Sequence, residues 1–246
     1  MAPPSVVFVP GFMQRGQAWA PVADLLSQRY SSVLVDHREH DREGRLGEIA
    51  EAAGEDGAVL CGYSLGGRLS LQAVLREPAR YRGLVTLGSS AGLQSEADRD
   101  ARINADEQLA SWMERSPIEE VVEVWERQPL FADQSEQLVA DQRPGRLSFS
   151  GAELARLLRS ASQGVTEPVW HHLPALELPL LALAGSRDER YLAAARRMAD
   201  LVRNGRAEAI EEAGHAAHLQ RPEAVVARLE RFLGELEGPP SRSAAV

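Results

Sequence analysis

The run Gly62-Tyr63-Ser64-Leu65-Gly66 decides the fold of this chain. An apolar segment that predicts a buried strand, Ala58–Gly62, precedes the serine, and a segment with helical spacing, Leu65–Arg76, follows it and ends at Pro78. A serine between a strand and a helix, with glycine two positions before and after it, is typical of a sharp, strained turn. Larger side chains at the glycine positions would collide with neighbouring backbone. We therefore expect Ser64 to stand exposed at the carboxyl end of a strand.

The same alternation of strands and helices continues along the chain. Further short apolar runs predict strands at Ser5–Val9, Ser32–Asp36, Gly83–Gly88, Leu178–Ala184 and Arg206–Glu211. Helical spacing of apolar residues predicts helices at Ala18–Arg29, Leu46–Ala53, Tyr191–Arg203 and Pro222–Leu236. Strands separated by helices predict an α/β fold with a mainly parallel sheet and helices on both faces.

The alternation stops between Gly92 and Trp170. Within this stretch, helical periodicity is clear around Gln108–Met113, Ile118–Trp125 and Ala152–Ser160. We expect residues 92–170 to form a helical cap over the carboxyl edge of the sheet, with residues 1–91 and 171–237 forming the core. Residues 238–246 have little apolar surface to bury and are predicted to be a disordered tail.

Composition excludes several classes of function. The 246 residues suit one α/β domain, and the net charge of −9 argues against nucleic acid or an anionic membrane as the partner. All 27 basic residues other than histidine are arginine. Cys61 is the single cysteine, and no signal peptide or apolar span is evident, so we expect a cytoplasmic protein that is a monomer or homodimer. No metal-ligand spacing, phosphate loop or dinucleotide fingerprint appears, so we expect no metal and no cofactor.

A serine hydroxyl needs a base to become reactive at neutral pH. After this kind of turn, the acid and the base follow the serine in the order Asp or Glu, then His. Asp188 comes just after the predicted strand Leu178–Ala184, and His215 comes just after the next strand. We expect His215 to take the proton of Ser64 and Asp188 to orient the imidazole and stabilise its charged form. The N–H of Leu65, at the start of the following helix, is the first candidate for an oxyanion donor.

Other residues compete for these roles. Glu189 could replace Asp188, and His218 could replace His215, although His218 falls in or near the last helix. Cys61 lies within a predicted strand and fits the core better than a nucleophilic role. The remaining histidines fit surface or packing roles; they are His37, His40, His171 and His172.

The residues around these positions resemble those of the 2-succinyl-6-hydroxy-2,4-cyclohexadiene-1-carboxylate synthases, a family with the α/β-hydrolase fold. The run from Gly62 to Gly66, extended to Gly67-Arg68, is similar to the corresponding run in that family. The matches continue through most of the chain. They comprise Gly92-Leu93-Gln94 with Arg99, Arg102 and Asp106; Trp125, Gln128-Pro129 and Phe131; Arg143; Ala184-Gly185 with Asp188; and Gly214-His215 with His218 and Pro222.

The resemblance implies a lyase that uses no cofactor. Its reaction is the elimination of pyruvate from 2-succinyl-5-enolpyruvyl-6-hydroxy-3-cyclohexene-1-carboxylate, a small anionic substrate, in menaquinone biosynthesis. Ser64, activated by His215 and Asp188, would remove a ring proton. The remaining roles implied are oxyanion donors at Phe12 and Leu65, carboxylate ligands at Arg68, Arg102 and Arg143, and pocket walls at Tyr63 and Trp125. Guanidinium groups suit carboxylates because they bind them through two parallel hydrogen bonds.

Two segments depart from the family pattern. Pro10-Gly11 stands where the family has His-Gly, and the segment Asp36–Glu43 lacks the usual turn glycines. These departures keep a second hypothesis open, a serine hydrolase of esters, thioesters or carbon–carbon bonds that acts on a small carboxylate-bearing substrate. A third is a non-catalytic binding module, which a large separation of Ser64 from His215 would favour. The convergence of Arg68, Arg102 and Arg143 in one pocket is the observation on which the lyase hypothesis depends.

Overall fold

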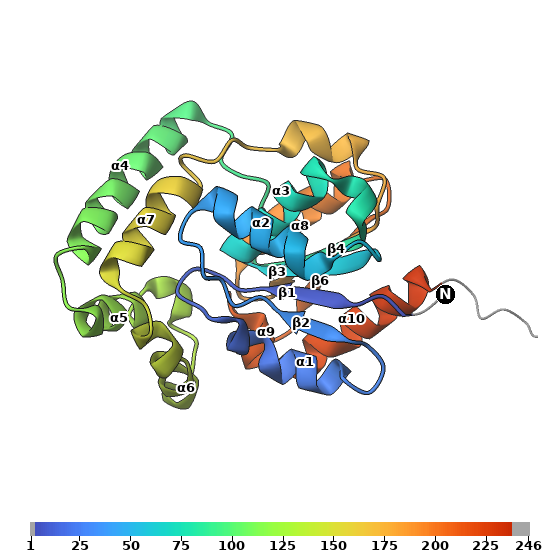
Figure 1. Cartoon of the computed structure of the whole chain (residues 1–246), viewed down its shortest axis with the longest axis horizontal. Helices are drawn as coiled ribbons and strands as arrows, with labels where there is room; N and C mark the ends of the chain where they lie inside the picture. Colours follow the sequence, from blue (N-terminus) through green and yellow to red (C-terminus); the bar gives the residue numbers. More distant parts are fainter. Residues whose placement is uncertain (1–2, 238–246) are drawn as a thin grey trace, which may run out of the picture.

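A single parallel sheet organises the molecule. The computed structural model describes residues 3–237, and its six strands lie in the order β2-β1-β3-β4-β5-β6 (Figure 1). Every neighbouring pair is parallel; for example, Val7 pairs with Val33 on one side and with Leu60 on the other. The strands are β1 (Val6–Val9), β2 (Ser32–Leu34), β3 (Ala58–Tyr63), β4 (Tyr81–Leu87), β5 (Leu180–Gly185) and β6 (Gly205–Ile210).

Helices cover both faces of the sheet. One face carries α2 (Arg42–Ala53), α3 (Leu65–Arg76) and α8 (Glu189–Leu201), and the other carries α1 (Ala20–Leu26), α9 (Ala217–Gln220) and α10 (Pro222–Leu236) (Figure 1). Successive strand residues point to opposite faces, so Val7 and Val6 belong to different apolar clusters. This explains why β1, β3 and β5 are buried along their whole length. The predicted α/β class with helices on both faces is confirmed.

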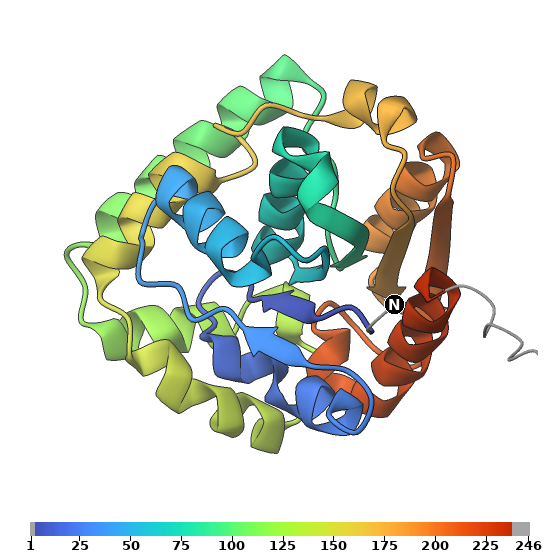
Figure 2. The same cartoon turned by 45° about the vertical axis from the view of Figure 1, so that its right-hand side comes forward.

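Four further helices stand together beside the carboxyl edge of the sheet, in the region predicted to form the cap. They are α4 (Glu96–Met113), α5 (Ile118–Glu126), α6 (Glu136–Leu147) and α7 (Gly151–Ala161), and they stay on one side of the core in both views (Figures 1 and 2). We call them the cap helices. They bury an apolar cluster of their own, to which the core contributes Met13.

Several element bounds differ from the prediction. β2 ends at Leu34, and α2 begins at Arg42 because the Asp41 side chain caps it, accepting the N–H of Gly44 at 2.9 Å. The segment Ala18–Arg29 divides into a 3-10 turn and α1. The sequence did not predict α6, which contains Pro144. The predicted tail 238–246 lies outside the described residues.

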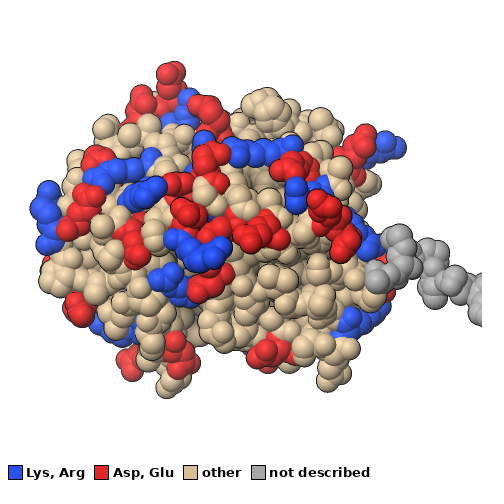
Figure 3. Space-filling model, in the orientation of Figure 1, with Lys and Arg blue, Asp and Glu red and all other residues tan. Residues whose placement is uncertain are grey.

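The remaining irregular elements are short 3-10 turns at Pro78–Arg80, Pro129–Phe131 and Trp170–Ala175. On the face shown in Figure 3, acidic and basic groups alternate over the cap helices and the core, without a large area of one sign. Over residues 3–237, no helix has the length and apolar character needed to cross a bilayer.

Candidate active site

The turn at Ser64 has the strained geometry that the sequence predicts. Ser64 has a φ of 51°, in the region that side chains rarely adopt. A Cβ atom added to Gly62 would lie 2.4 Å from the carbonyl oxygen of Gly66, and one added to Gly66 would lie 2.3 Å from that of Val9. Both contacts are with backbone, which cannot move aside. The turn therefore requires glycine at both positions, and it presents Ser64 at the carboxyl end of β3.

Ser64, His215 and Asp188 form a hydrogen-bonded chain. His215 Nε2 lies 3.1 Å from Ser64 Oγ, and His215 Nδ1 lies 2.6 Å from Asp188 Oδ2. His215 is 2% exposed and Asp188 is 8% exposed. The ring of His215 fits against Gly88, where an added Cβ would approach it to 3.1 Å. Such a chain can move a proton from the serine to the imidazole while the carboxylate stabilises the imidazolium. The separation that would favour a non-catalytic module is not found.

None of the competing histidines forms a hydrogen bond with Ser64 within the described residues. His218 is buried between the rings of Trp19 and Tyr63, each centroid 4.4 Å away, and both of its nitrogens lack partners. Burial lowers the pKa of His218 to about 3. The others pair elsewhere: His37 with Glu48, His40 with Glu153, and His171 with the ring of His172.

The two other competitors also lie apart from the chain. The side chain of Glu189 is exposed at the start of α8, whereas that of Asp188 is buried. Cys61 is fully buried in β3, and burial raises the pKa of its thiol.

A cavity of about 120 Å³ opens beside Ser64, between the sheet edge and the cap helices. Six of the residues singled out in the sequence line it: Phe12, Ser64, Leu65, Arg68, Arg102 and Trp125. Leucine side chains of the cap helices supply much of the apolar wall. The small volume and the mixed lining suit a small substrate with polar or charged groups.

Arg68 is the unusual member of this lining. It follows Ser64 by one turn of α3, and its N–H donates to the Ser64 carbonyl at 3.2 Å. Its guanidinium forms no ion pair within the described residues; it makes one long hydrogen bond, of 3.5 Å, to the carbonyl oxygen of Ala161. The Nε atom is buried without a partner. Burial lowers the pKa of Arg68, because the surroundings solvate the charge poorly.

The two other expected arginines behave differently from each other. Arg102 lines the cavity and pairs with the buried Asp106, one turn along α4, at 2.7 Å. Arg143 pairs with Glu126, is 40% exposed and is absent from the cavity wall. The expected convergence of three arginines is therefore met by two of them.

The arginine of α6 that faces inward is Arg146, which the sequence analysis missed. Its side chain is 3% exposed, pairs with Glu126 at 3.1 Å, and lies over the ring of Phe131. Arg146 follows Arg143 by three residues, so the two lie on adjacent parts of one helical face. Only the rotation of α6 against the core decides which of them is buried.

The loop after β1 places Phe12 against the cavity without the histidine that the resemblance leads one to expect. Gln14 orders this loop instead: its Oε1 accepts the N–H of Gly11 at 3.2 Å, and its own N–H donates to the Gly11 carbonyl at 3.3 Å. Within residues 3–237 the N–H groups of Phe12 and Leu65 donate no hydrogen bond. Both remain available to an oxyanion beside Ser64.

Tyr63 and Trp125 have distinct surroundings. Tyr63 is buried under Gly11, and its ring lies 5.2 Å from that of His215, outside the cavity wall. Trp125 lines the cavity, with its ring centroid 5.2 Å from that of Phe12. The cavity wall also contains Tyr191 and Gln163, which the sequence analysis did not single out. Tyr191 follows Asp188 by one turn, which is the one sequence signal that could have found it.

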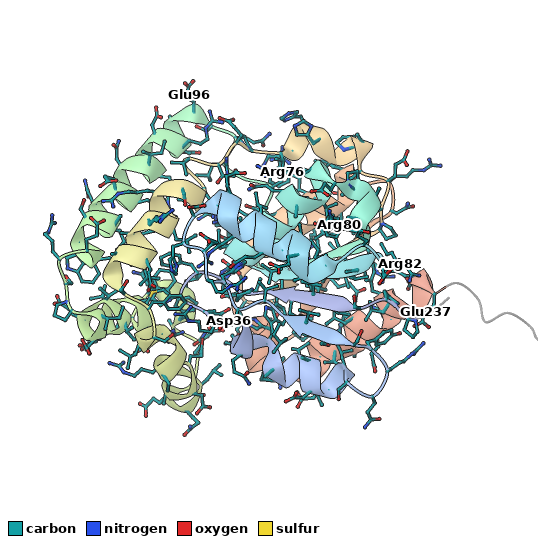
Figure 4. All side chains as sticks on the ribbon, in the orientation of Figure 1. Asp36, Arg76, Arg80, Arg82, Glu96 and Glu237 are labelled. Carbon is teal, nitrogen blue, oxygen red and sulfur yellow. The ribbon has the colours of Figure 1, made fainter. Side chains whose placement is uncertain are left out.

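The segment Asp36–Glu43, which lacks the expected glycines, ties the core to α7. Figure 4 shows Asp36 at the end of the sheet that faces the cap helices. His40 pairs with Glu153 at 3.1 Å, and Asp41 pairs with Arg156 at 2.6 Å. These contacts hold α7 over the cavity. In the part of the chain that the structure describes, no group of three His, Cys, Asp or Glu side chains is arranged to hold a metal ion.

Comparison with known proteins gives consistent results. The chain matches the family model described as alpha/beta hydrolase family over residues 6–228. It is similar to the 2-succinyl-6-hydroxy-2,4-cyclohexadiene-1-carboxylate synthase of Yersinia enterocolitica serotype O:8 / biotype 1B (strain NCTC 13174 / 8081), with 31% identity over 249 residues, 94% of this chain and 87% of that protein.

Two solved structures share the fold. The MenH structure from S. aureus matches with a TM-score of 0.88 at 24% identity, covering 96% of this chain and 95% of that one. The malate-bound thermophilic esterase from Thermogutta terrifontis matches with a TM-score of 0.78 at 20% identity, covering 95% and 90%.

Proposed function

This chain belongs to the α/β-hydrolase family, and from that premise we propose that it is a lyase of the 2-succinyl-6-hydroxy-2,4-cyclohexadiene-1-carboxylate synthase type. It would eliminate pyruvate from 2-succinyl-5-enolpyruvyl-6-hydroxy-3-cyclohexene-1-carboxylate, a step of menaquinone biosynthesis. The similarity to the Yersinia synthase over most of both chains supports this choice of reaction. The site residues of the proposal are Ser64, His215 and Asp188, with Arg68 and Arg102 as carboxylate ligands.

The observation that carries the proposal is the unpaired guanidinium of Arg68. A cation that is partly withdrawn from water and has no carboxylate partner in the described chain carries a desolvation cost. An anionic ligand in the cavity would offset that cost, because guanidinium and carboxylate bind through two charge-assisted hydrogen bonds. A neutral ester would leave Arg68 uncompensated. The cavity therefore favours a substrate that brings negative charge to the wall one turn beyond Ser64.

The chemistry follows from the order of the hydrogen bonds. His215 takes the proton of Ser64, and the serine oxygen removes a proton from the substrate ring. The electron pair left behind is delocalised onto a substrate oxygen, which the N–H groups of Leu65 and Phe12 stabilise. When the pair returns to the ring, the bond to the enolpyruvyl oxygen breaks and pyruvate leaves as its enolate. His215 returns its proton to that enolate, which restores the neutral imidazole and gives pyruvate. Each preorganised donor would contribute about 3–4 kcal/mol to transition-state stabilisation.

The test is direct. Purified protein is given the enolpyruvyl substrate, and pyruvate release is followed with a coupled dehydrogenase against the spontaneous release in buffer. We expect release well above the spontaneous rate, and a loss of roughly a thousandfold or more in kcat for Ser64→Ala. The matched control is Ser27→Ala, an exposed serine whose hydroxyl donates to the Asp24 carbonyl at the end of α1. Release no faster than in buffer would exclude the lyase.

A serine hydrolase is the second candidate, and the placement of the arginines favours it. The lyase substrate carries three carboxylates, whereas two arginines of the predicted three line the cavity. A smaller ester or thioester with a single carboxylate would be matched by fewer cations. In this mechanism Ser64 attacks the carbonyl carbon, forms an acyl-enzyme, and water then releases the acid. Hydrolysis of short p-nitrophenyl esters whose acyl group carries a free carboxylate would test it, and turnover unchanged in Ser64→Ala would count against it.

A further inference from the structure

We propose that Tyr191, held by Gln163, is a specificity-determining residue that selects a deprotonated carboxylate at Arg68. The inference deepens the proposed function and rests on it, since it concerns the substrate anion of the same cavity. Neither residue belongs to the Ser64–His215–Asp188 chain, and both line the cavity.

The two side chains come from different elements of the structure. Tyr191 lies on α8, one turn after Asp188, and its ring centroid is 4.7 Å from that of His215. Gln163 lies in the segment that returns from α7 to the core. Its Nε2 donates to the Tyr191 hydroxyl oxygen at 3.1 Å, and the exposed fractions are 6% for Gln163 and 8% for Tyr191. A buried bond between the return segment and α8 fixes the phenol in one orientation.

The hydrogen-bond inventory of Tyr191 leaves its proton available. A phenol has one O–H donor and an oxygen that also accepts. Gln163 occupies the oxygen as an acceptor, and within the described residues the Tyr191 hydroxyl donates no hydrogen bond. Tyr191 lines the same cavity as Arg68 and Arg102. Its O–H thus lies in the same wall as the unpaired cation.

This wall therefore presents donors without matching acceptors. Arg68 has five N–H donors and no acceptor, its Nε is buried without a partner, and Tyr191 adds an O–H. A deprotonated carboxylate only accepts hydrogen bonds, so it satisfies both groups at once. A protonated acid, an amide or an alcohol brings a hydrogen-bond donor of its own, so that one donor of the ligand faces one donor of the cavity wall. A buried donor without a hydrogen-bond partner costs free energy. Arg68 and Tyr191 therefore favour a carboxylate by attracting it and also disfavour neutral ligands, which would leave a donor unpaired.

The experiment uses the full chain and succinate, with succinamide as the neutral probe of the same shape. Affinities are measured by isothermal titration calorimetry at fixed ionic strength. We expect wild type to bind succinate and not succinamide, Tyr191→Phe to bind succinate about tenfold more weakly, and Gln163→Leu to be weakened by a smaller factor. Arg68→Met should lose succinate binding. The matched control is Tyr81→Phe. Tyr81 is the first residue of β4 and does not line the cavity, so this variant should bind succinate as wild type does.

The split between KM and kcat distinguishes a role of Tyr191 in substrate binding from a purely structural role, because a loss of packing alone is not expected to raise KM selectively. In the pyruvate assay, Tyr191→Phe should raise KM about tenfold and leave kcat within about twofold. Equal succinate affinity in Tyr191→Phe and wild type would overturn the inference, and so would wild type that does not bind succinate. Both outcomes leave the proposed function to be judged separately, by pyruvate release in wild type. A Tyr191→Phe variant that no longer distinguishes succinate from succinamide supports the assignment.

Discussion

Replacing the two cavity arginines should change stability in opposite directions. Arg68→Met removes a partly buried guanidinium that forms no ion pair, while keeping a flexible apolar side chain of similar length. Asp106 acts favourably on this charge without forming an ion pair with it, so burial remains the larger influence on the Arg68 guanidinium. Removing this poorly solvated charge is expected to stabilise the fold by about 1–2 kcal/mol. Arg102→Met instead deprives Asp106, whose side chain is 6% exposed, of its partner. It should destabilise by about 1–2 kcal/mol.

In a domain of this size, 1 kcal/mol corresponds to roughly 2–4 °C in Tm. We therefore expect Arg68→Met to melt roughly 2–8 °C above wild type and Arg102→Met to melt below it by a similar amount. Scanning calorimetry at one pH and ionic strength measures both. Both variants should raise KM for an anionic substrate, so the Arg68 variant would be more stable and less active.

The refuting result is specific. A lower Tm for Arg68→Met than for wild type would mean that the guanidinium is already compensated in the folded protein and does not require an anionic ligand. Added succinate offers a second check, because a ligand that binds only the folded state raises its stability by mass action. Succinate should raise the Tm of wild type and have little effect on Arg68→Met.

Three further changes test other parts of the structure. Gly66→Ala should abolish soluble folded protein, because the added Cβ would lie 2.3 Å from a carbonyl oxygen of β1. A Cβ added at Gly47 meets no atom within 4 Å, so Gly47→Ala should leave the free energy of unfolding in urea unchanged or raise it. Asp41→Ala should cost about 1–2 kcal/mol, since it removes both the cap of α2 and the ion pair with Arg156; Arg156→Ala removes the ion pair alone, so it should cost less and vary with salt. His218 keeps a pKa of about 3 when folded, so the unfolded chain takes up its proton first as pH falls below about 6.5. The contribution of neutral His218 to the free energy of unfolding is fully present above pH 6.5 and is lost as the pH falls toward about 3. The urea midpoint of His218→Leu should therefore fall less steeply on acidification than that of wild type.

The sequence by itself determined the features that depend on local backbone geometry. Glycine at 62 and 66 is required by contacts within one strand-turn-helix unit, so the spacing predicts the turn and the exposure of Ser64. The order of Asp188 and His215 after it predicts the hydrogen-bonded chain, because parallel strands bring their carboxyl ends to one edge. Pro222 marks the first residue of α10 for an equally local reason, since proline fits the first helical turn.

Only the tertiary structure decided which side chains meet across the cavity. Arg143 and Arg146 are equally plausible in sequence, and the rotation of α6 buries the second. Gln163 and Tyr191 are 28 residues apart on different elements, and no spacing rule joins them. The unpaired state of Arg68 is likewise a property of what surrounds it in space. Backbone sterics act over a few residues and leave a trace in the sequence, whereas side-chain pairing depends on how distant helices pack, which no single segment specifies.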